Sequence, residues 1–174
     1  AFRKRGRALA FVPSHLHTVH GVSLAAAGSL VMLFGFGGFA FALRSRQMIK
    51  RFGEVGLIRN GAVMMALPML VVAYSPVWWL AVPACFLFGL GFYMMHNTLQ
   101  INATQMAPQR RGAAVAAFAS CFFVGQAAGV ALGGALLATT GTAHIIAAAG
   151  AGVWLIGRRF ARLRAAKEAQ GATP

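Results

Sequence analysis

Acidic residues are almost absent from this sequence. Its 174 residues include 2 Asp or Glu in total, and charged residues of both signs make up 10% of the chain. A soluble domain has about 25% charged residues, so this scarcity argues against a soluble protein. A soluble nucleic-acid-binding domain is also excluded, because the 16 Lys and Arg stand in a chain that is 59% hydrophobic. Intrinsic disorder requires low hydrophobicity and is excluded for the same reason.

Cysteine is scarce as well. Cys85 and Cys121 give no disulfide framework and no metal-binding spacing, and we expect both to act as small apolar residues within helices. The sequence contains no Gly-x-Ser-x-Gly and no His-Glu-x-x-His pattern, and no acid lies within its apolar stretches. These absences predict that the protein is not an enzyme and that it uses no cofactor.

The cations that are present fall into four clusters. The stretches between them, residues 8–43, 60–109 and 112–157, contain no Asp, Glu, Lys or Arg. A membrane-spanning helix needs about 20 apolar residues, so the second and third stretches are each long enough for two helices. The clusters consist of Arg3, Lys4, Arg5 and Arg7; Arg44, Arg46, Lys50, Arg51 and Arg59; Arg110 and Arg111; and Arg158, Arg159, Arg162, Arg164 and Lys167.

Short polar breaks at Ser75-Pro76 and at residues 139–142 divide the two longer stretches. The sequence therefore predicts an all-α, polytopic membrane bundle of five full transmembrane helices plus a truncated one. We expect a basic N-terminus and helix remnant at 1–20, a transmembrane bundle at 21–160 and a basic tail at 161–174. The five full helices are expected at about 21–43, 57–74, 77–103, 112–138 and 143–160.

Threading these helices alternately across a bilayer puts every basic cluster on one side. Lys and Arg mark the cytoplasmic side of a membrane, so 44–56, 104–111 and the C-terminal tail are expected to be cytoplasmic. The breaks at 75–76 and 139–142 are then external, with Trp78 and Trp79 in an external aromatic belt. We expect an integral protein of a bacterial inner (plasma) membrane with a cytoplasmic C-terminus.

Three sequence patterns stand out within this layout. The first is Leu-Arg-Ser-Arg-Gln-Met-Ile-Lys-Arg-Phe-Gly at 43–53, and the second is the segment 89–112, which includes His-Asn-Thr-Leu-Gln at 96–100. The third is Gly-Gln-Ala-Ala-Gly-Val-Ala-Leu-Gly-Gly at 125–134. Together they resemble the C-terminal half of a major facilitator superfamily transporter, in a bacterial branch of sugar or drug efflux permeases. The resemblance covers about 8–160.

This resemblance implies secondary active transport of a small solute, such as a sugar or a drug-like compound, by alternating access, with efflux favoured. It makes 8–20 the remnant of the seventh of twelve helices, and the missing N-terminal half becomes a partner. Lys50, Arg51 and Gly53 match the basic cytoplasmic loop between helices eight and nine, but the Asp that usually precedes them is absent. Two alternatives stay open: a truncated, non-transporting membrane fragment and, less favoured, an integral membrane enzyme.

Four polar residues of the 77–103 helix are candidates for a solute cavity: Tyr93, His96, Asn97 and Gln100. Tyr93, Asn97 and Gln100 are spaced four and three apart and share a helix face. The family's tenth helix lines the central cavity, which implies contact with solute. Interhelical hydrogen bonding or solvation near the cytoplasmic end is the alternative. If the transporter is proton-coupled, His96 is the central candidate in this chain, because no acid lies in a span.

Glycines four apart at Gly125, Gly129 and Gly133 make a smooth stripe on which another helix backbone can pack closely. We expect similar close contacts or bends at Gly35, Gly37 and Gly38. The stripe therefore predicts a helix-packing surface.

Other residues are interpreted more simply. Gln126 is expected to hydrogen-bond across helices, with a role in substrate binding as the alternative. Phe122 and Phe123 are expected to contact lipid or the bundle core. Histidines at 15, 17 and 20 have no carboxylate or thiolate nearby, so we expect exposed interfacial histidines rather than a metal site.

Overall fold

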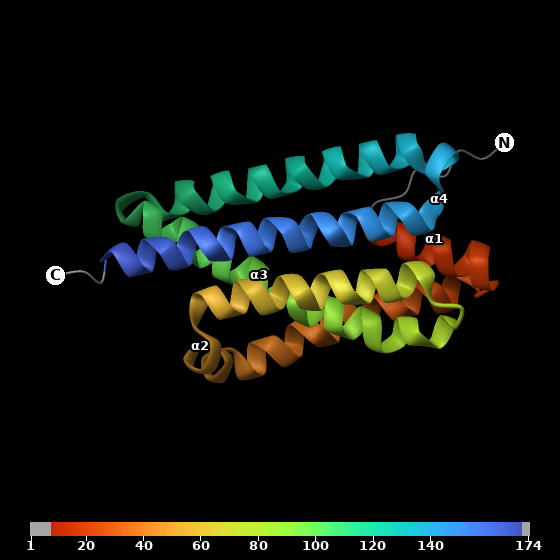
Figure 1. Ribbon diagram of the computed structural model, residues 1–174, viewed down its shortest axis with the longest axis horizontal. Helices are drawn as coiled ribbons and strands as arrows, with labels where there is room; N and C mark the ends of the chain where they lie inside the picture. The colour runs from red at the N-terminus through yellow and green to blue at the C-terminus, as the bar shows by residue number, and fades with distance from the viewer. Residues whose placement is uncertain (1–7, 172–174) are drawn as a thin grey trace.

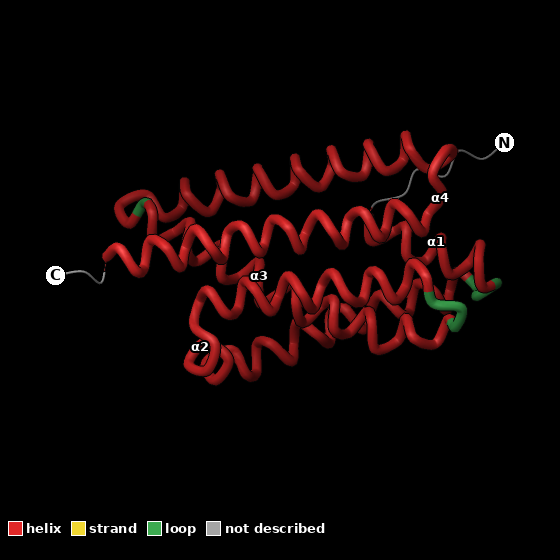
Figure 2. Tube along the Cα trace, in the orientation of Figure 1, coloured by secondary structure: helices red, strands yellow, loops and turns green. Residues whose placement is uncertain are grey.

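The computed structural model describes residues 8–171, and every element that it describes is helical. In chain order these are α1 (Ala8–His20), α2 (Leu24–Tyr74), η1 (Trp78–Leu80), α3 (Ala81–Met106), η2 (Pro108–Arg110) and α4 (Arg111–Gly171). The helices run along the long axis of the molecule, and the connections lie at its two ends (Figures 1 and 2). The basic segment at 1–7 and the last residues of the predicted tail, 172–174, lie outside the described residues.

The turn between α1 and α2 is specified by local sequence. Gly21 adopts a φ of 67°, which glycine reaches without steric cost and which commonly ends a helix. Ser23 then caps α2, since its Oγ accepts a hydrogen bond from the Ala26 amide at 3.2 Å. The 13-residue α1 therefore folds back onto the helix that follows it.

Single glycines reverse the chain within α2 and within α4. Gly53 has φ 63° and ψ 179°, and Gly141 has φ 75° and ψ 165°; these are conformations that favour glycine. Each of these two helices therefore consists of two arms that run in opposite directions (Figure 1). The helix continues through the basic segment 44–52, so the reversal expected across 44–56 is concentrated at one residue.

Within residues 8–171, four helical segments are long and apolar enough to cross a membrane: Leu24–Tyr74, Trp78–Met106, Pro108–Leu137 and Thr139–Lys167. The first is 51 residues long and includes the break at Gly53. The prediction of an all-α membrane bundle is confirmed at this level.

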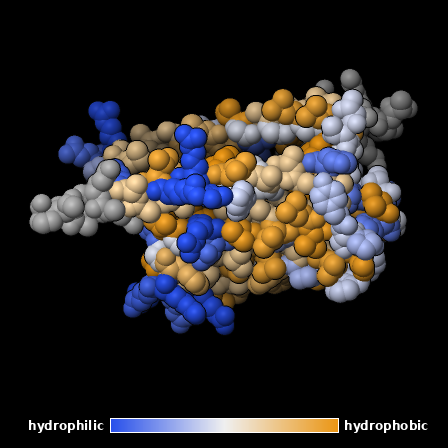
Figure 3. All heavy atoms as spheres, viewed as in Figure 1, coloured by the Kyte–Doolittle hydropathy of each residue, from blue (hydrophilic) through white to orange (hydrophobic). Residues whose placement is uncertain are grey.

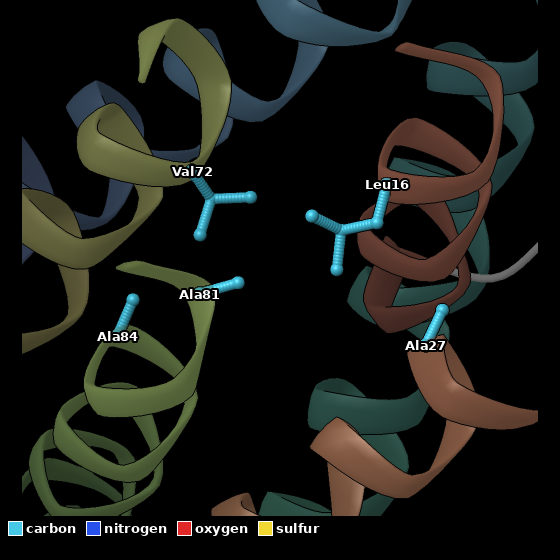
Figure 4. Close-up of a cluster of buried hydrophobic side chains, with 5 residues drawn as sticks. All are labelled: Leu16, Ala27, Val72, Ala81 and Ala84. Carbon is cyan, nitrogen blue, oxygen red and sulfur yellow. The ribbon is translucent and has the colours of Figure 1, made fainter. Parts of the chain in front are cut away.

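Buried hydrophobic side chains fix α1 against α2 and α3. Leu16, Ala27, Val72, Ala81 and Ala84 form one cluster, and Figure 4 shows Leu16 of α1 pointing toward Val72 of α2. Leu16 is only 1% exposed. The cluster lies near the end of the bundle that contains the connection between α2 and α3.

Glycines bring α2 and α3 into close backbone contact. A Cβ added to Gly37 would clash with the Phe86 carbonyl oxygen, and one on Gly38 would clash with the Tyr93 ring. One on Gly89 would clash with the Phe34 backbone. The close approach expected at Gly37 and Gly38 is confirmed, whereas Gly35 is exposed and a Cβ added there would meet no atom within 4 Å.

Strongly hydrophilic side chains gather toward the end of the bundle where the C-terminus lies, and hydrophobic side chains cover the middle of the face in Figure 3. The Gly53 reversal and η2 lie at the same end (Figure 1). The basic clusters at 44–59, 110–111 and 158–167 therefore share one end of the described bundle. Which side of the membrane this end faces stays a prediction.

Candidate functional site

A cavity of about 300 Å³ lies among α1, α2, α3 and α4. Its lining is almost entirely hydrocarbon and sulfur, and Gln126 contributes the side-chain amide. The lining residues are Val12 of α1; Phe34, Met65, Pro68, Met69 and Val72 of α2; Ala84, Cys85, Phe88 and Phe92 of α3; and Phe122, Phe123 and Gln126 of α4.

Five phenylalanines of this lining form a connected group, here called the aromatic cluster: Phe34, Phe88, Phe92, Phe122 and Phe123. The ring of Phe34 lies 5.9 Å from Phe88 and 5.3 Å from Phe92, between ring centroids. The ring of Phe122 lies 6.0 Å from Phe92 and 5.6 Å from Phe123. Aromatic rings attract one another at centroid separations of about 4.5–7 Å, so the cluster links α2, α3 and α4 across the cavity.

His96 extends the ring contacts of the aromatic cluster by one turn along α3. Its ring stacks on Phe92 at 5.0 Å with 14° between the planes. It also lies 4.9 Å from Phe122 and 5.3 Å from Phe118 of α4. The imidazole therefore contacts aromatic rings of two helices, α3 and α4.

The four predicted cavity residues do not share one set of contacts in the structure. Tyr93 packs on α2, with its ring 5.7 Å from that of Phe34 and close against Gly38. His96 faces α4 instead, and Asn97 and Gln100 are half-buried. None of the four belongs to the lining of the described cavity, which His96 reaches only through Phe92 and Phe122.

A polar contact that the sequence analysis missed joins three helices near the basic end. The Glu54 carboxylate, at Oε2, accepts hydrogen bonds from Arg164 Nη2 at 3.1 Å and from Asn102 Nδ2 at 3.0 Å. Asn102 also donates to the Thr98 carbonyl oxygen at 2.8 Å and is only 6% exposed. One signal was present in the sequence: Glu54 is an isolated acid among many cations, which favours an ion pair.

The predicted loop residues directly precede this contact. Lys50 and Arg51 are exposed on the last turn of the first arm of α2, and the Arg51 guanidinium lies 5.6 Å from the centroid of the Phe52 ring. Gly53 makes the reversal, and Glu54 begins the second arm. No Asp precedes these residues, and the acid that forms the ion pair, Glu54, directly follows Gly53.

The glycine stripe at 125–133 contributes little to packing within the chain itself. A Cβ added at Gly125 or Gly129 would meet no other atom within 4 Å, whereas Gly133 is buried. The most apolar stretch of Pro108–Leu137 has none of its residues buried. A packing role for Gly125 and Gly129 stays a prediction, for a surface that the described residues leave open.

The expectation of exposed histidines is wrong at His15. This side chain is 2% exposed, and its Nδ1 lies 2.8 Å from Thr142 Oγ1 of α4. Burial, and secondly the charge of His20, lower the pKa of His15 below its ordinary value. His17 Nδ1 lies 2.9 Å from the Val22 carbonyl oxygen. Among the described residues, no three His, Cys, Asp or Glu side chains are grouped so as to hold a metal ion.

Apolar helices of spanning length, an apolar cavity among them and cations gathered at one end are the features of an integral membrane protein. A family profile described as Major Facilitator Superfamily matches residues 6–173. The chain therefore belongs to the major facilitator superfamily, whose members are membrane transporters of small solutes rather than enzymes. In the same comparisons, no curated protein and no solved structure matched the chain.

Proposed function

We propose that the chain forms the C-terminal half of a secondary active transporter, a permease of the bacterial inner membrane. It exports a small solute, a sugar or a drug-like compound, by alternating access. The observation that supports this is the cavity of about 300 Å³ that lies among helices of a transporter family. Such transporters bind solute between their helical repeats near the middle of the membrane.

In this proposal the bundle has five full spans, and α1 is the outer end of a sixth. Gly53 divides α2 into two spans, which adds one to the four segments that are long enough to cross a membrane. The end with the basic clusters faces the cytoplasm, as the distribution of Lys and Arg predicts. The C-terminus is therefore cytoplasmic.

The partner of this half is the N-terminal half of the transporter. The open surface of α4 around Gly125 and Gly129 supports this, because glycines at helical spacing let another helix approach closely. When the two halves meet, Tyr93, His96, Asn97 and Gln100 are the residues of α3 that contact solute in the central pathway. His96 is the candidate for proton coupling, since its ordinary pKa lies near physiological pH.

Transport by inverted membrane vesicles tests the proposal. Vesicles that contain the product of the full reading frame are supplied with labelled sugars and drug-like compounds, and uptake is compared with that of vesicles without the protein. We expect energy-dependent uptake of at least one compound, which Asn97→Ala and Gln100→Ala reduce. Gln105→Ala, on the exposed end of α3, is the matched control and should leave uptake unchanged.

Two outcomes would count against the proposal. Unchanged flux in both Asn97→Ala and Gln100→Ala would show that this face of α3 does not contact the solute. Absence of flux for every compound, with protein present in the membrane, would favour a non-transporting membrane fragment.

A further inference from the structure

We infer that the cavity binds an uncharged, flat aromatic compound of two or three rings, and not a sugar. The inference rests on the proposed transport function and narrows its solute class. It follows from the chemistry, ring geometry and size of the cavity.

The apolar walls of the cavity offer the hydroxyl groups of a sugar few hydrogen-bond partners. Its side chains are hydrocarbon, thioether and thiol, apart from the Gln126 amide at the α4 side. A hydroxyl that leaves water without gaining a hydrogen-bond partner loses free energy. A ligand with one polar group directed at Gln126 avoids this cost, whereas a sugar with several hydroxyls does not.

The rings of the aromatic cluster suit an aromatic guest. Phe34 and Phe88 are tilted by 40°, Phe92 and Phe122 by 57°, and Phe122 and Phe123 by 71°. Rings tilted in this way offer both edges and faces, which are the surfaces that attract another ring in offset or edge-to-face contact. They come from α2, α3 and α4, so a flat guest would contact three helices at once.

The charge of the lining selects an uncharged ligand. Phenylalanine faces attract cations, but the lining contains no acidic side chain to balance a buried positive charge. It contains no Lys or Arg to balance a negative one. Burying an unpaired charge costs far more free energy than burying an apolar ring.

The size of the cavity sets the size of the ligand. Its volume of about 300 Å³ is at the lower end of the range of small-molecule pockets, about 300–1,000 Å³. Val72 and Ala84 line the cavity and also belong to the buried cluster with Leu16 (Figure 4). That cluster closes the cavity on one side, whereas Phe123, which is 63% exposed, lies on the open side at α4. A volume of about 300 Å³ accommodates two or three rings of a guest that enters from this open side.

Binding of N-phenyl-1-naphthylamine, a neutral aromatic amine whose N–H can donate to the Gln126 carbonyl oxygen, tests the inference. The chain is purified into lipid nanodiscs, and probe fluorescence is measured above that of empty nanodiscs. We expect saturable binding that glucose does not displace. Tetraphenylphosphonium, a cationic comparator, should displace the probe more weakly than diphenylamine, a neutral aromatic amine, does.

Variants connect this binding to the cavity. Loss of one ring in Phe92→Ala or Phe122→Ala should weaken binding about tenfold. Phe122→Leu keeps apolar volume without a ring and should weaken it similarly if the ring matters, even where the alanine variants fold poorly. Gln126→Leu should weaken it several-fold. Phe39→Ala, a ring 63% exposed and outside the lining, is the matched control.

Each contrary result overturns a defined part of the inference. Unchanged affinity in Phe122→Leu and Gln126→Leu, or an equal loss in Phe39→Ala, would show that the probe does not bind in this cavity. Displacement by glucose, or tighter binding of tetraphenylphosphonium, would overturn the chemical class. Transport of a sugar without amine binding would overturn the inference and leave the proposed function standing, whereas amine binding without any flux would do the reverse.

Discussion

Glu54 of α2 and Arg164 of α4 form an ion pair at 3.1 Å, although they are 110 positions apart in the sequence. Their side chains are 32% and 28% exposed, so water and salt screen the pair. Because Asn102 of α3 donates to the same carboxylate oxygen, the pair joins the ends of three helices. Its contribution to stability is measurable.

A double-mutant cycle of Glu54→Gln and Arg164→Gln should give a coupling free energy of about 0.2–1 kcal/mol, the range for partly exposed pairs. Thermal unfolding in detergent measures it, and raising the salt concentration should reduce it. Arg162→Gln, which removes an exposed cation of the same helix, is the control for net charge. If Arg162→Gln couples to Glu54→Gln as strongly as Arg164→Gln does, Glu54 and Arg164 do not form a specific pair.

Gly37→Ala should destabilise the bundle by about 1–3 kcal/mol, because the added methyl group meets the Phe86 carbonyl oxygen across the contact between α2 and α3. Gly35→Ala, two residues earlier, meets no atom within 4 Å and should be neutral or slightly stabilising. The melting temperatures of the two variants in detergent provide the comparison. Equal melting temperatures would show that α2 and α3 do not approach closely at Gly37.

Gly53→Ala should destabilise the reversal within α2 by about 1–3 kcal/mol, since φ 63° with ψ 179° is a region nearly restricted to glycine. Gly112→Ala, placed in an open part of α4, controls for the general effect of a glycine substitution. Limited proteolysis near residue 53 and the melting temperature both report the effect. If Gly53→Ala is as stable as wild type, the chain reverses elsewhere.

Stability should depend on pH through His15. Burial lowers the pKa of this imidazole in the folded state, so the folded protein binds the proton less readily than the unfolded chain does. The stabilisation is present above the ordinary pKa of 6.5 and is lost as the pH falls through the lowered value. The melting temperature of the wild-type protein should therefore decrease as the pH is lowered from 7.5 to 5.

The pH dependence should be smaller in His15→Asn, which keeps a polar group for Thr142 and cannot become charged in this range. His144→Asn removes an exposed histidine and should retain the wild-type slope. A slope that persists in His15→Asn would assign the effect to another group.

The positions of the helices followed from the sequence where charge and turn residues mark them. α2 ends at Tyr74, directly before Ser75 and Pro76, and Gly141 reverses α4 within the predicted break at 139–142. The basic segment before Gly53 was harder to interpret, because Lys and Arg are good helix formers and leave no local sign of where a helix stops. The single-residue reversal there became visible only in the backbone angles.

The site was less predictable than the helices. Helical spacing places Tyr93 and Asn97 on one face, but it does not say which neighbour that face meets. Phe122, Phe123 and Gln126 line the cavity. The sequence alone does not distinguish this role from contact with lipid, because phenylalanine is common in both places. Glu54 and Asn102 meet across 48 positions, and such long-range pairs leave no periodic pattern in one sequence.

Helix α3 connects the apolar cavity to the polar contact at the basic end of the bundle. Phe92 at the cavity and Asn102 at the Glu54 carboxylate lie on the same unbroken helix, Ala81–Met106, separated by about 15 Å at 1.5 Å per residue. One unbroken helix therefore supplies both a wall of the cavity and the Asn102 hydrogen bond to Glu54, so the cavity and the basic end of the bundle share a structural element.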